Sequence, residues 1–350
     1  MRNFLLFSLL LFFLACKSQK NSKVEDIIYA PLDSSKVVQR IAFGSCNHED
    51  DPQLMWEPIL AQSPDLWIWL GDNIYGDSDD AKVLKAKYEL QLSHEEYQGF
   101  IKTVPQVGIW DDHDYGVNDG DKTYALKKES KTLMLDFLNV PANAPQRVRE
   151  GAYSSYLLGS GEQKVKVLLL DARYFRDPLE RNPADDGQLY IPNTEGDILG
   201  EAQWTWLEEE LRNSEAQYHI IGCGIQMIAA EHNFEKWANF PKARKRFFDL
   251  MEKTKPSNTI LISGDRHITE ISKIELEGLD YPLYDITSSG LTHSFERIRE
   301  VGEINSHREG DKYAGDKNYG LFDIDWEKDQ LKVEIRGVKN QLILETLIQY

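Results

Sequence analysis

The sequence predicts an α/β fold in which a mixed β-sheet, or a pair of sheets, is flanked by helices. Three observations support this class. Short apolar runs alternate with longer amphipathic segments, an alternating apolar–polar stretch with a turn follows near the C-terminus, and polar residues collect where the apolar runs end. Strands separated by helices favour parallel pairing, whereas a short turn favours an antiparallel hairpin, so the sheet should be mixed.

Seven apolar runs have the length and composition of buried strands. These runs are 39–46 (QRIAFGSC), 65–72 (DLWIWLGD), 106–114 (QVGIWDDHD), 165–173 (VKVLLLDAR), 219–226 (HIIGCGIQ), 258–265 (NTILISGD) and 283–290 (LYDITSSG). Beyond residue 316, GLFDIDWEKDQLKVEIRG alternates apolar and polar residues around EKDQ. This pattern predicts an antiparallel hairpin.

The segments between these runs have helical composition. They are 53–62, 81–98, 122–138, 201–213 and 242–253. The segment 201–213 is the clearest, because Trp204, Leu207 and Leu211 recur at helical spacing behind an acidic first turn. The last helix is expected to begin at Pro241, a residue favoured in the first turn.

Composition limits the classes of partner. The chain has 350 residues, 41% of them hydrophobic, and a net charge of −18. Its length and apolar content suffice for a sizeable core, and residues 38–350 are expected to form a single domain. The acidic excess disfavours a long nucleic acid as partner, although a local positive centre in a cleft is compatible with it.

The N-terminus has the pattern of an export signal. Residues 1–15 carry one positive charge and an unbroken apolar run, which predicts a signal peptide, and FLAC resembles a bacterial lipobox. The resemblance implies lipid on Cys16 and a polar tether over 16–37, hence a cell-envelope lipoprotein held at a membrane. The alternatives are an ordinary cleaved signal and an uncleaved anchor.

Five of the apolar runs end in a polar cluster: GSCN (44–47), GDNIYGD (71–77), DDHD (111–114), DAR (171–173) and GDRH (264–267). Functional sites of α/β sheets lie at the carboxyl ends of strands. Carboxylates crowded in one place repel one another, and bound cations relieve that repulsion. The sequence therefore predicts a centre with two metal ions, bridged by Asp72; the alternative is a set of ordinary acidic turns.

The ordered set FGSCN, LGDNIY, WDDHDYG, LDARYFRD and SGDRH resembles the PhoD-like alkaline phosphatases, a branch of the calcineurin-like metallophosphoesterases. The resemblance covers roughly residues 38–295. It implies a four-layer αββα sandwich of two mixed β-sheets flanked by helices. It also implies hydrolysis of phosphate mono- or diesters by a metal-activated water at a two-metal centre.

The resemblance assigns metal ligands residue by residue. The first site it implies consists of Cys46, Asp72, Tyr75 and His267, and its thiolate and phenolate suit Fe(III). The second consists of Asp72, Asp112 and Asp265, whose oxygens suit Ca²⁺, with Mg²⁺ or Mn²⁺ as alternatives. Gln226 is a secondary candidate.

Other structural interpretations of these ligands remain open. Cys46 could be a buried apolar residue, or it could form a disulfide with Cys223. Without that disulfide, Cys223 is predicted to be a core residue. Tyr75 could be a core aromatic with a satisfied hydroxyl.

The remaining site residues are assigned roles toward the substrate. His113 is expected to stabilise the transition state or protonate the leaving group, with a structural cap as the alternative. Asp111 and Asp114, which flank the Asp112–His113 pair, are expected to hold the strand end or to orient His113.

Two arginines are candidates for binding phosphate. Arg173 is the expected clamp, because a guanidinium matches phosphate oxygens, and the alternative is an ion pair with Asp171 or Asp177. Arg266 has the same two interpretations. Asn73 is expected either to bind substrate or to set its turn.

The sequence thus predicts an exported, metal-dependent phosphoric ester hydrolase, an alkaline phosphatase or phosphodiesterase. Alternatives are a phospholipase or nucleotide phosphodiesterase of the same fold, and a non-catalytic lipoprotein that binds metal or glycan. Residues 180–200 and 303–320 have no regular pattern and are expected to form lids that could gate the site.

Overall fold

The computed structural model describes residues 27–184 and 187–350 and contains two large β-sheets. The first sheet has six strands in the order β15 (Leu342–Gln349), β14 (Gln330–Arg336), β13 (Tyr319–Asp325), β1 (Arg40–Gly44), β2 (Leu66–Leu70) and β3 (Gln106–Ile109). Strands β1, β2 and β3 are parallel, and β13, β14 and β15 add to them as antiparallel neighbours. The sheet is therefore mixed, with the predicted C-terminal hairpin as one half of it.

The second sheet has seven strands. Their order is β12 (Arg308–Ala314), β10 (Thr269–Ile274), β11 (Leu283–Ser288), β9 (Thr259–Ser263), β8 (Tyr218–Cys223), β5 (Gln163–Leu170) and β4 (Ser154–Ser160). The four central strands β11, β9, β8 and β5 pair in parallel, and the outer pairs are antiparallel.

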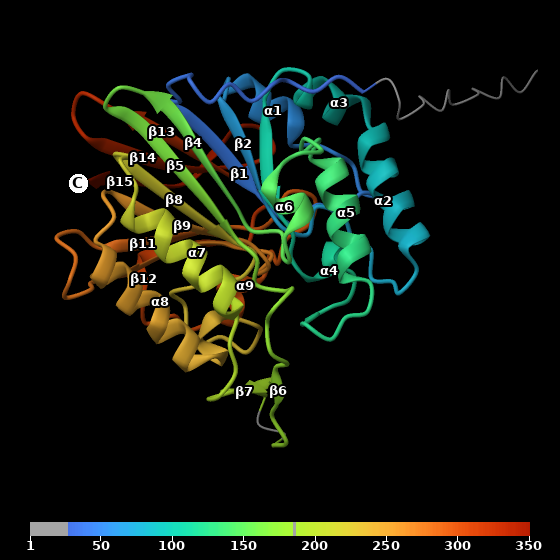
Figure 1. The fold of residues 1–350 in the computed structure, drawn as a ribbon, viewed down its shortest axis with the longest axis vertical. Helices are drawn as coiled ribbons and strands as arrows, with labels where there is room; N and C mark the ends of the chain where they lie inside the picture. Colours follow the sequence, from blue (N-terminus) through green and yellow to red (C-terminus); the bar gives the residue numbers. More distant parts are fainter. Residues whose placement is uncertain (1–26, 185–186) are drawn as a thin grey trace, which may run out of the picture.

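Helices form the outer layers (Figure 1). The helices that share a hydrophobic core with the first sheet are α1 (Trp56–Ala61), α2 (Ala81–Ser93), α3 (Glu95–Ile101) and α5 (Lys127–Phe137). Those packed on the second sheet are α7 (Gly200–Arg212) and α8 (Pro241–Thr254). Short pieces are α4 (Asp112–Tyr115), α6 (Pro145–Val148), the 3₁₀ turn η2 (Trp237–Asn239), α9 (Ile298–Val301) and the pair β6 (Glu180–Arg181) and β7 (Tyr190–Ile191).

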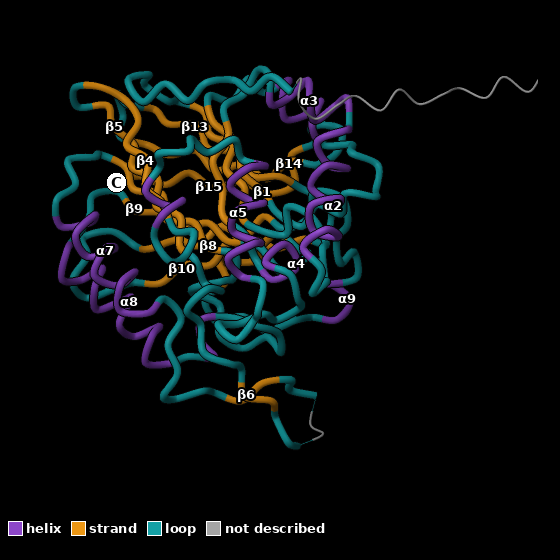
Figure 2. Tube along the Cα trace, turned by 45° about the vertical axis from the view of Figure 1, so that its right-hand side comes forward, coloured by secondary structure: helices purple, strands orange, loops and turns teal. Residues whose placement is uncertain are grey.

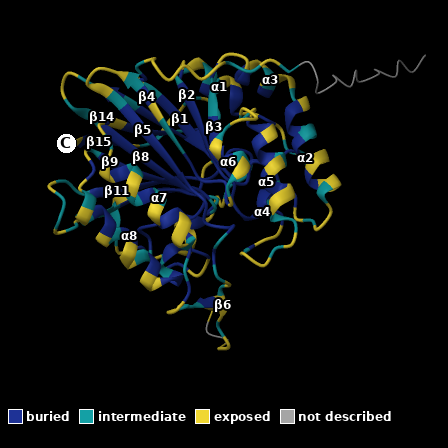
Figure 3. Ribbon diagram, in the orientation of Figure 1, coloured by how far each residue is buried: buried dark blue, intermediate teal, exposed yellow. Residues whose placement is uncertain are grey.

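The alternation of side chains along the second sheet demonstrates the layering. On β5, Val165, Val167 and Leu169 pack with the first sheet and its helices, whereas Leu168 and Leu170 pack with α7 and α8. Successive side chains of a strand point to opposite faces, so the second sheet is covered on both sides. Figure 3 shows the central strands mostly in the colour of buried residues, and the helices with exposed outer faces. The predicted four-layer sandwich is confirmed.

All seven predicted strands and the C-terminal hairpin are present, but some boundaries differ from the predictions. The helix predicted over 81–98 is split at His94, whose backbone is extended with ψ 123°. The segment 303–320, expected as an irregular lid, contains β12, and 180–200 contains the small β6–β7 pair. Figures 1 and 2 both show that pair projecting from the end of the molecule where the loops gather.

The start of the packed domain also differs from the prediction. Residues 27–37, expected to belong to a tether, already lie against the domain: Tyr29 donates a hydrogen bond to the carbonyl of Phe137, and the Ala30 amide donates to the carbonyl of Ile101. The predicted signal peptide and Cys16 lie outside the described residues. Among the helices that the structure describes, none combines the length and the apolar character needed to cross a membrane.

Candidate metal centre

The predicted ligands lie in tight turns that directly follow strand ends. Cys46 follows β1, Asp72 follows β2, and Asp265 and His267 follow β9. All four have positive φ, at 61°, 49°, 68° and 53°, a backbone region that is uncommon for residues other than glycine. Strained residues of this kind cluster at functional sites, where the surrounding structure holds them in place.

Glycine 71 shows why these turns come so close together. Its φ is +94°, and a Cβ at this position would lie 2.3 Å from the Cβ of Asp111. Only glycine permits this backbone conformation and this approach. The turn after β2 therefore packs directly on the turn after β3, which brings Asp72 close to Asp112.

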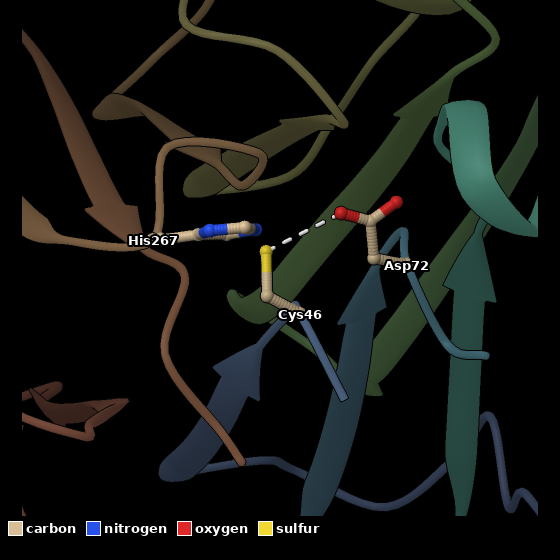
Figure 4. Close-up of side chains that lie close together, drawn as sticks. All are labelled: Cys46, Asp72 and His267. Carbon is tan, nitrogen blue, oxygen red and sulfur yellow. Dashed lines mark hydrogen bonds between the residues drawn. The ribbon is translucent and has the colours of Figure 1, made fainter. Parts of the chain in front are cut away.

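The first cluster joins both sheets (Figure 4). The Cys46 thiol lies 3.4 Å from Asp72 Oδ2, and the ligand atoms of Cys46, Asp72 and His267 all lie within 4.8 Å of one another. Tyr75 completes the group, because its hydroxyl lies 3.3 Å from Asp72 Oδ2 and 3.1 Å from His267 Nε2. The structure thus brings together all four residues predicted for the first site.

His293, which was not predicted, also belongs to this cluster. Its Nε2 lies 3.0 Å from the Tyr75 hydroxyl and 3.3 Å from His267 Nε2. It follows β11, and the same rule that identified the other strand ends applies to the sequence GLTHS. We read it as a partner that holds the Tyr75 oxygen in position.

A second cluster lies beside the first and is rich in oxygen. Asp72, Asp112 and His113 form one group with ligand atoms within 4.8 Å, and Asp111, Asp112 and Asp265 form another. Asp72 is shared with the first cluster, and Asp112 links Asp72 to Asp265. The predicted second site is therefore assembled, with Asp111 as an additional carboxylate.

The electrostatics of this cluster favour protons or cations. Burial, reinforced by Asp112, raises the pKa of Asp72 to about 8, and burial raises the pKa of Asp114 to about 7. Burial also raises the pKa of Asp265, with a further increase from Asp112. Within the part of the chain that the structure describes, Asp72 Oδ1 and Asp111 Oδ2 find no hydrogen-bond partner. Buried oxygens without donors, beside acids that resist ionisation, fit divalent or trivalent cations.

Burial has the same consequence for the softer ligands. It raises the pKa of the Cys46 thiol and of the Tyr75 phenol, and Asp72 adds to both shifts. A bound cation would favour the thiolate and the phenolate, which are the forms that bind metals. Burial lowers the pKa of His267 to about 4, so its imidazole is neutral and free to act as a ligand.

Asp114 ties the turns together rather than facing the site. It accepts hydrogen bonds from the amides of Asp72, Asn73 and Asp111, at 3.1, 3.3 and 2.7 Å. The Asn73 side chain donates to Asp114 at 2.6 Å and to the carbonyl of Ile109 at 3.2 Å. Both donors of Asn73 are thus engaged and its side chain is buried. Of its two predicted roles, these two hydrogen bonds fit the setting of the turn.

Arg173 requires a similar correction. Its guanidinium has no exposed surface, and it pairs with Asp111 at 2.7 Å and with Glu235 at 2.6 Å. Arg176 reaches the other oxygen of Glu235 at 3.0 Å. The guanidinium is held by these buried carboxylates, and Arg173 is not among the described residues that line the cavity beside the ligands. The predicted alternative of an ion pair describes it better, although the partners differ from Asp171 and Asp177.

His113 and Arg266 do reach the open side. A cavity of about 540 Å³ is lined by Asp112, His113, Asp265, Arg266 and His267, together with residues of the surrounding loops. Asp77 accepts a hydrogen bond from His113 Nδ1 at 2.7 Å. Burial lowers the pKa of His113, but Asp77, Asp72 and Asp112 outweigh this effect and raise the pKa to about 10. Arg266 pairs with Glu303 at 2.6 Å.

The structure also decides between the alternatives for the two cysteines and gives the contacts of Gln226. Cys46 and Cys223 are both free thiols, so the disulfide alternative is wrong. Cys223 packs in the core with α7 and α8, as predicted. Gln226 donates to Thr287 at 2.7 Å and to Glu270 at 3.2 Å. No role is predicted from the sequence for Glu235, which lies in a loop without a recognisable pattern, or for Asp77, although Asp77 ends the polar cluster 71–77.

The geometry of Arg173 generates a prediction about stability. Arg173→Gln leaves Asp111 without its buried cation and leaves Glu235 with Arg176 alone, so we expect the free energy of unfolding to fall by about 3–5 kcal/mol. Urea unfolding of the chelator-treated protein measures this change. Arg297→Gln is the control, because that guanidinium is 75% exposed and pairs with Glu300, which is also exposed. This substitution should cost less than about 1 kcal/mol.

A phosphate clamp would behave differently. Suppose instead that Arg173→Gln kept the wild-type free energy of unfolding and raised the KM for a phosphate ester. That result would contradict the structural role and support the prediction that Arg173 binds phosphate.

Comparison with known proteins adds the family. The sequence matches the family described as PhoD-like phosphatase over residues 41–335. One solved structure of similar fold is "Structure of PhoD", with 16% identity, a TM-score of 0.71, and coverage of 90% of this chain and 70% of that chain. Another is a dimetal phosphatase from Danio rerio, with 13% identity, a TM-score of 0.56, and coverage of 90% and 100%. A comparison with curated proteins gives no match. Because the family match spans most of the chain, this protein belongs to the PhoD-like phosphatases and is a phosphoric ester hydrolase.

Proposed function

We propose that the chain is an exported phosphatase or phosphodiesterase that hydrolyses small phosphate mono- or diesters at a centre of two metal ions. One observation carries the proposal. Six predicted ligands from the four turns after β1, β2, β3 and β9 converge at one end of the sandwich, and two of the buried oxygens there have no donor among the described residues. A structural set of acidic turns would not need to bury oxygens without partners.

The side chains divide between two ion positions. Cys46, Tyr75 and His267 would hold the first ion, Asp112 and Asp265 the second, and Asp72 both. When bound, two ions of this kind activate a water molecule and neutralise charge on the phosphoryl oxygens. Asp111 is held by Arg173 beside the second position, so the ligand shell is fixed by a buried ion pair.

Two residues of the cavity would act on the ester itself. Asp77 holds His113 Nδ1, so Nε2 is the ring nitrogen left to donate a proton to the leaving oxygen. Arg266 lines the same cavity and would bind a non-bridging phosphoryl oxygen, with Glu303 orienting its guanidinium. The positive charges of His113 and Arg266 would attract an anionic ester to the cavity, although the protein as a whole is negatively charged.

Donor chemistry supports different metals at the two positions. A thiolate, a phenolate and an imidazole suit Fe(III), whereas carboxylate oxygens alone suit Ca²⁺, Mg²⁺ or Mn²⁺. We propose Fe(III) at the first position and Ca²⁺ at the second.

Substitution of the shared ligand tests the activity. Asp72→Asn removes the carboxylate common to both positions, so kcat/KM for an aryl phosphate ester should fall by more than about a hundredfold. The bound metal, measured by elemental analysis, should fall with it. Asp249→Asn on α8 is the control, because that carboxylate is exposed and pairs with the exposed Lys245. Hydrolysis at the wild-type rate by Asp72→Asn would eliminate the two-metal proposal.

Tyr75 tests the identity of the first metal. In oxidised, iron-loaded protein we expect a visible absorption band with the resonance Raman vibrations of a phenolate, since tyrosinate bound to Fe(III) transfers charge in the visible range. Tyr75→Phe should remove those vibrations, and Tyr281→Phe, whose hydroxyl contacts the carbonyl of Pro256, should retain them. A spectrum that Tyr75→Phe leaves unchanged would argue against iron bound by Tyr75.

Export and lipid attachment are proposed from the first sixteen residues alone. Cys16→Ser removes the atom that would carry the lipid. We expect this variant, expressed with its own leader in a bacterial host, to leave the membrane fraction and lose incorporated labelled palmitate. Unchanged membrane association and labelling would exclude lipidation at Cys16.

A further inference from the structure

Three large apolar side chains are exposed around the mouth of the cavity. Leu189, Phe234 and Phe295 are 42%, 45% and 41% exposed, and all three line the cavity that the predicted ligands Asp112, Asp265 and His267 also line. They come from three separate segments: Leu189 precedes β7, Phe234 lies in the loop after β8, and Phe295 follows β11. We call these three side chains the apolar rim. Exposed apolar groups that gather at a pocket indicate a ligand that covers them.

The apolar rim is fixed to the site by backbone and ring contacts. The Phe295 amide donates to the carbonyl of His267 at 2.6 Å, so its position is tied to a predicted ligand. The guanidinium of Arg266 lies over the ring of Phe234 at 4.5 Å from the ring centre. One face of Phe234 is therefore joined to the group expected to bind phosphate.

The β6–β7 pair contributes the third wall. Arg181 stacks on the ring of Tyr190 at 4.7 Å, and the carbonyl of Leu189 accepts a hydrogen bond from the amide of Asn182 at 3.0 Å. Tyr190 in turn donates a hydrogen bond to Asp119, which also lines the cavity. The hairpin is thus connected to the floor of the site while it presents an apolar side chain at the mouth.

The two ends of the cavity differ in chemistry. Its floor carries Asp112, Asp265 and His267, and Arg266 lies between this floor and Phe234. A small hydrophilic phosphate ester would leave the apolar rim in water. A volume of about 540 Å³ holds a compact molecule and is too small for both acyl chains of a phospholipid.

We infer that the preferred substrate is a phosphoester whose alcohol part carries a compact apolar group, such as a single ring, which packs on Leu189, Phe234 and Phe295. This inference rests on the proposed hydrolysis at the floor of the same cavity. The apolar rim determines specificity and takes no part in the chemical step.

Two esters with alcohols of similar acidity test the inference. Benzyl phosphate carries a ring and methyl phosphate does not, so their ratio of kcat/KM reports on contact with the ring rather than on leaving-group reactivity. We expect the metal-loaded wild type to favour benzyl phosphate by about tenfold or more, mainly through a lower KM. Phe234→Ala and Phe295→Ala should each reduce that ratio severalfold, and Leu189→Ala should do so to a smaller extent.

A matched control lies on β4. Leu157 is 45% exposed and does not line the cavity among the described residues, so Leu157→Ala should keep the wild-type ratio. Binding gives a readout independent of turnover: in calorimetry, benzylphosphonate should bind the metal-loaded wild type more tightly than methylphosphonate. Phe234→Ala should remove most of that difference.

The outcomes separate this inference from the proposed function. Equal kcat/KM for both esters in the wild type, or a ratio unchanged by the rim substitutions, would overturn the inference and leave the hydrolase intact. A strong preference for dodecyl phosphate over benzyl phosphate would also overturn it, because it would indicate a lipid-like chain. If the protein hydrolysed none of these esters and bound the two phosphonates equally, both the inference and the proposed function would be contradicted.

Discussion

The burial of several carboxylates at one end of the sandwich is the constraint on which the rest of the structure depends. Asp72, Asp111 and Asp112 are at most 3% exposed, and they lie beside the partly buried Asp265. Arg173 supplies one buried positive charge to this group, and Asp111 receives it. Among the described residues no lysine or arginine forms an ion pair with Asp72, and burial raises its pKa to about 8. Cations at the two ligand groups would supply the missing charge.

The carboxyl ends of strands from both sheets meet at this cluster. Parallel strands β1, β2 and β3 deliver Cys46, Asp72 and Asp112 from one sheet, and β9 delivers Asp265 and His267 from the other. Glycine 71 and the positive φ of the ligands let the turns approach within van der Waals distance. The fold and the site are therefore consequences of one arrangement, since the strand ends that close the core also carry the chemistry.

Much of this was predictable from the sequence, because strand ends can be read from local pattern. The runs 39–46, 65–72, 106–114 and 258–265 are all predicted as strands, and their polar ends as a shared site. The pairing of Arg173 with Glu235 could not be predicted, since Glu235 lies in a loop whose path is set by tertiary packing. Asn73 was ambiguous for the same reason: whether an amide faces a ligand or its own turn depends on the neighbouring strand. His293 follows the strand-end rule and could have been identified by applying it to β11.

The shape of the cavity depends on residues that lie outside the sequence motifs. Its floor comes from the strand ends, whereas its mouth comes from loops such as the β6–β7 pair, which vary without affecting the core. Catalytic chemistry and choice of ester are thus determined by different parts of the chain.

Metal content tests the central claim most directly. The full chain, purified without chelator and dialysed against metal-free buffer, should retain about two metal ions per molecule by elemental analysis, and their removal should lower the melting temperature. A chain that carries no metal, binds none on addition of iron and calcium, and melts at the same temperature with or without chelator would contradict the account.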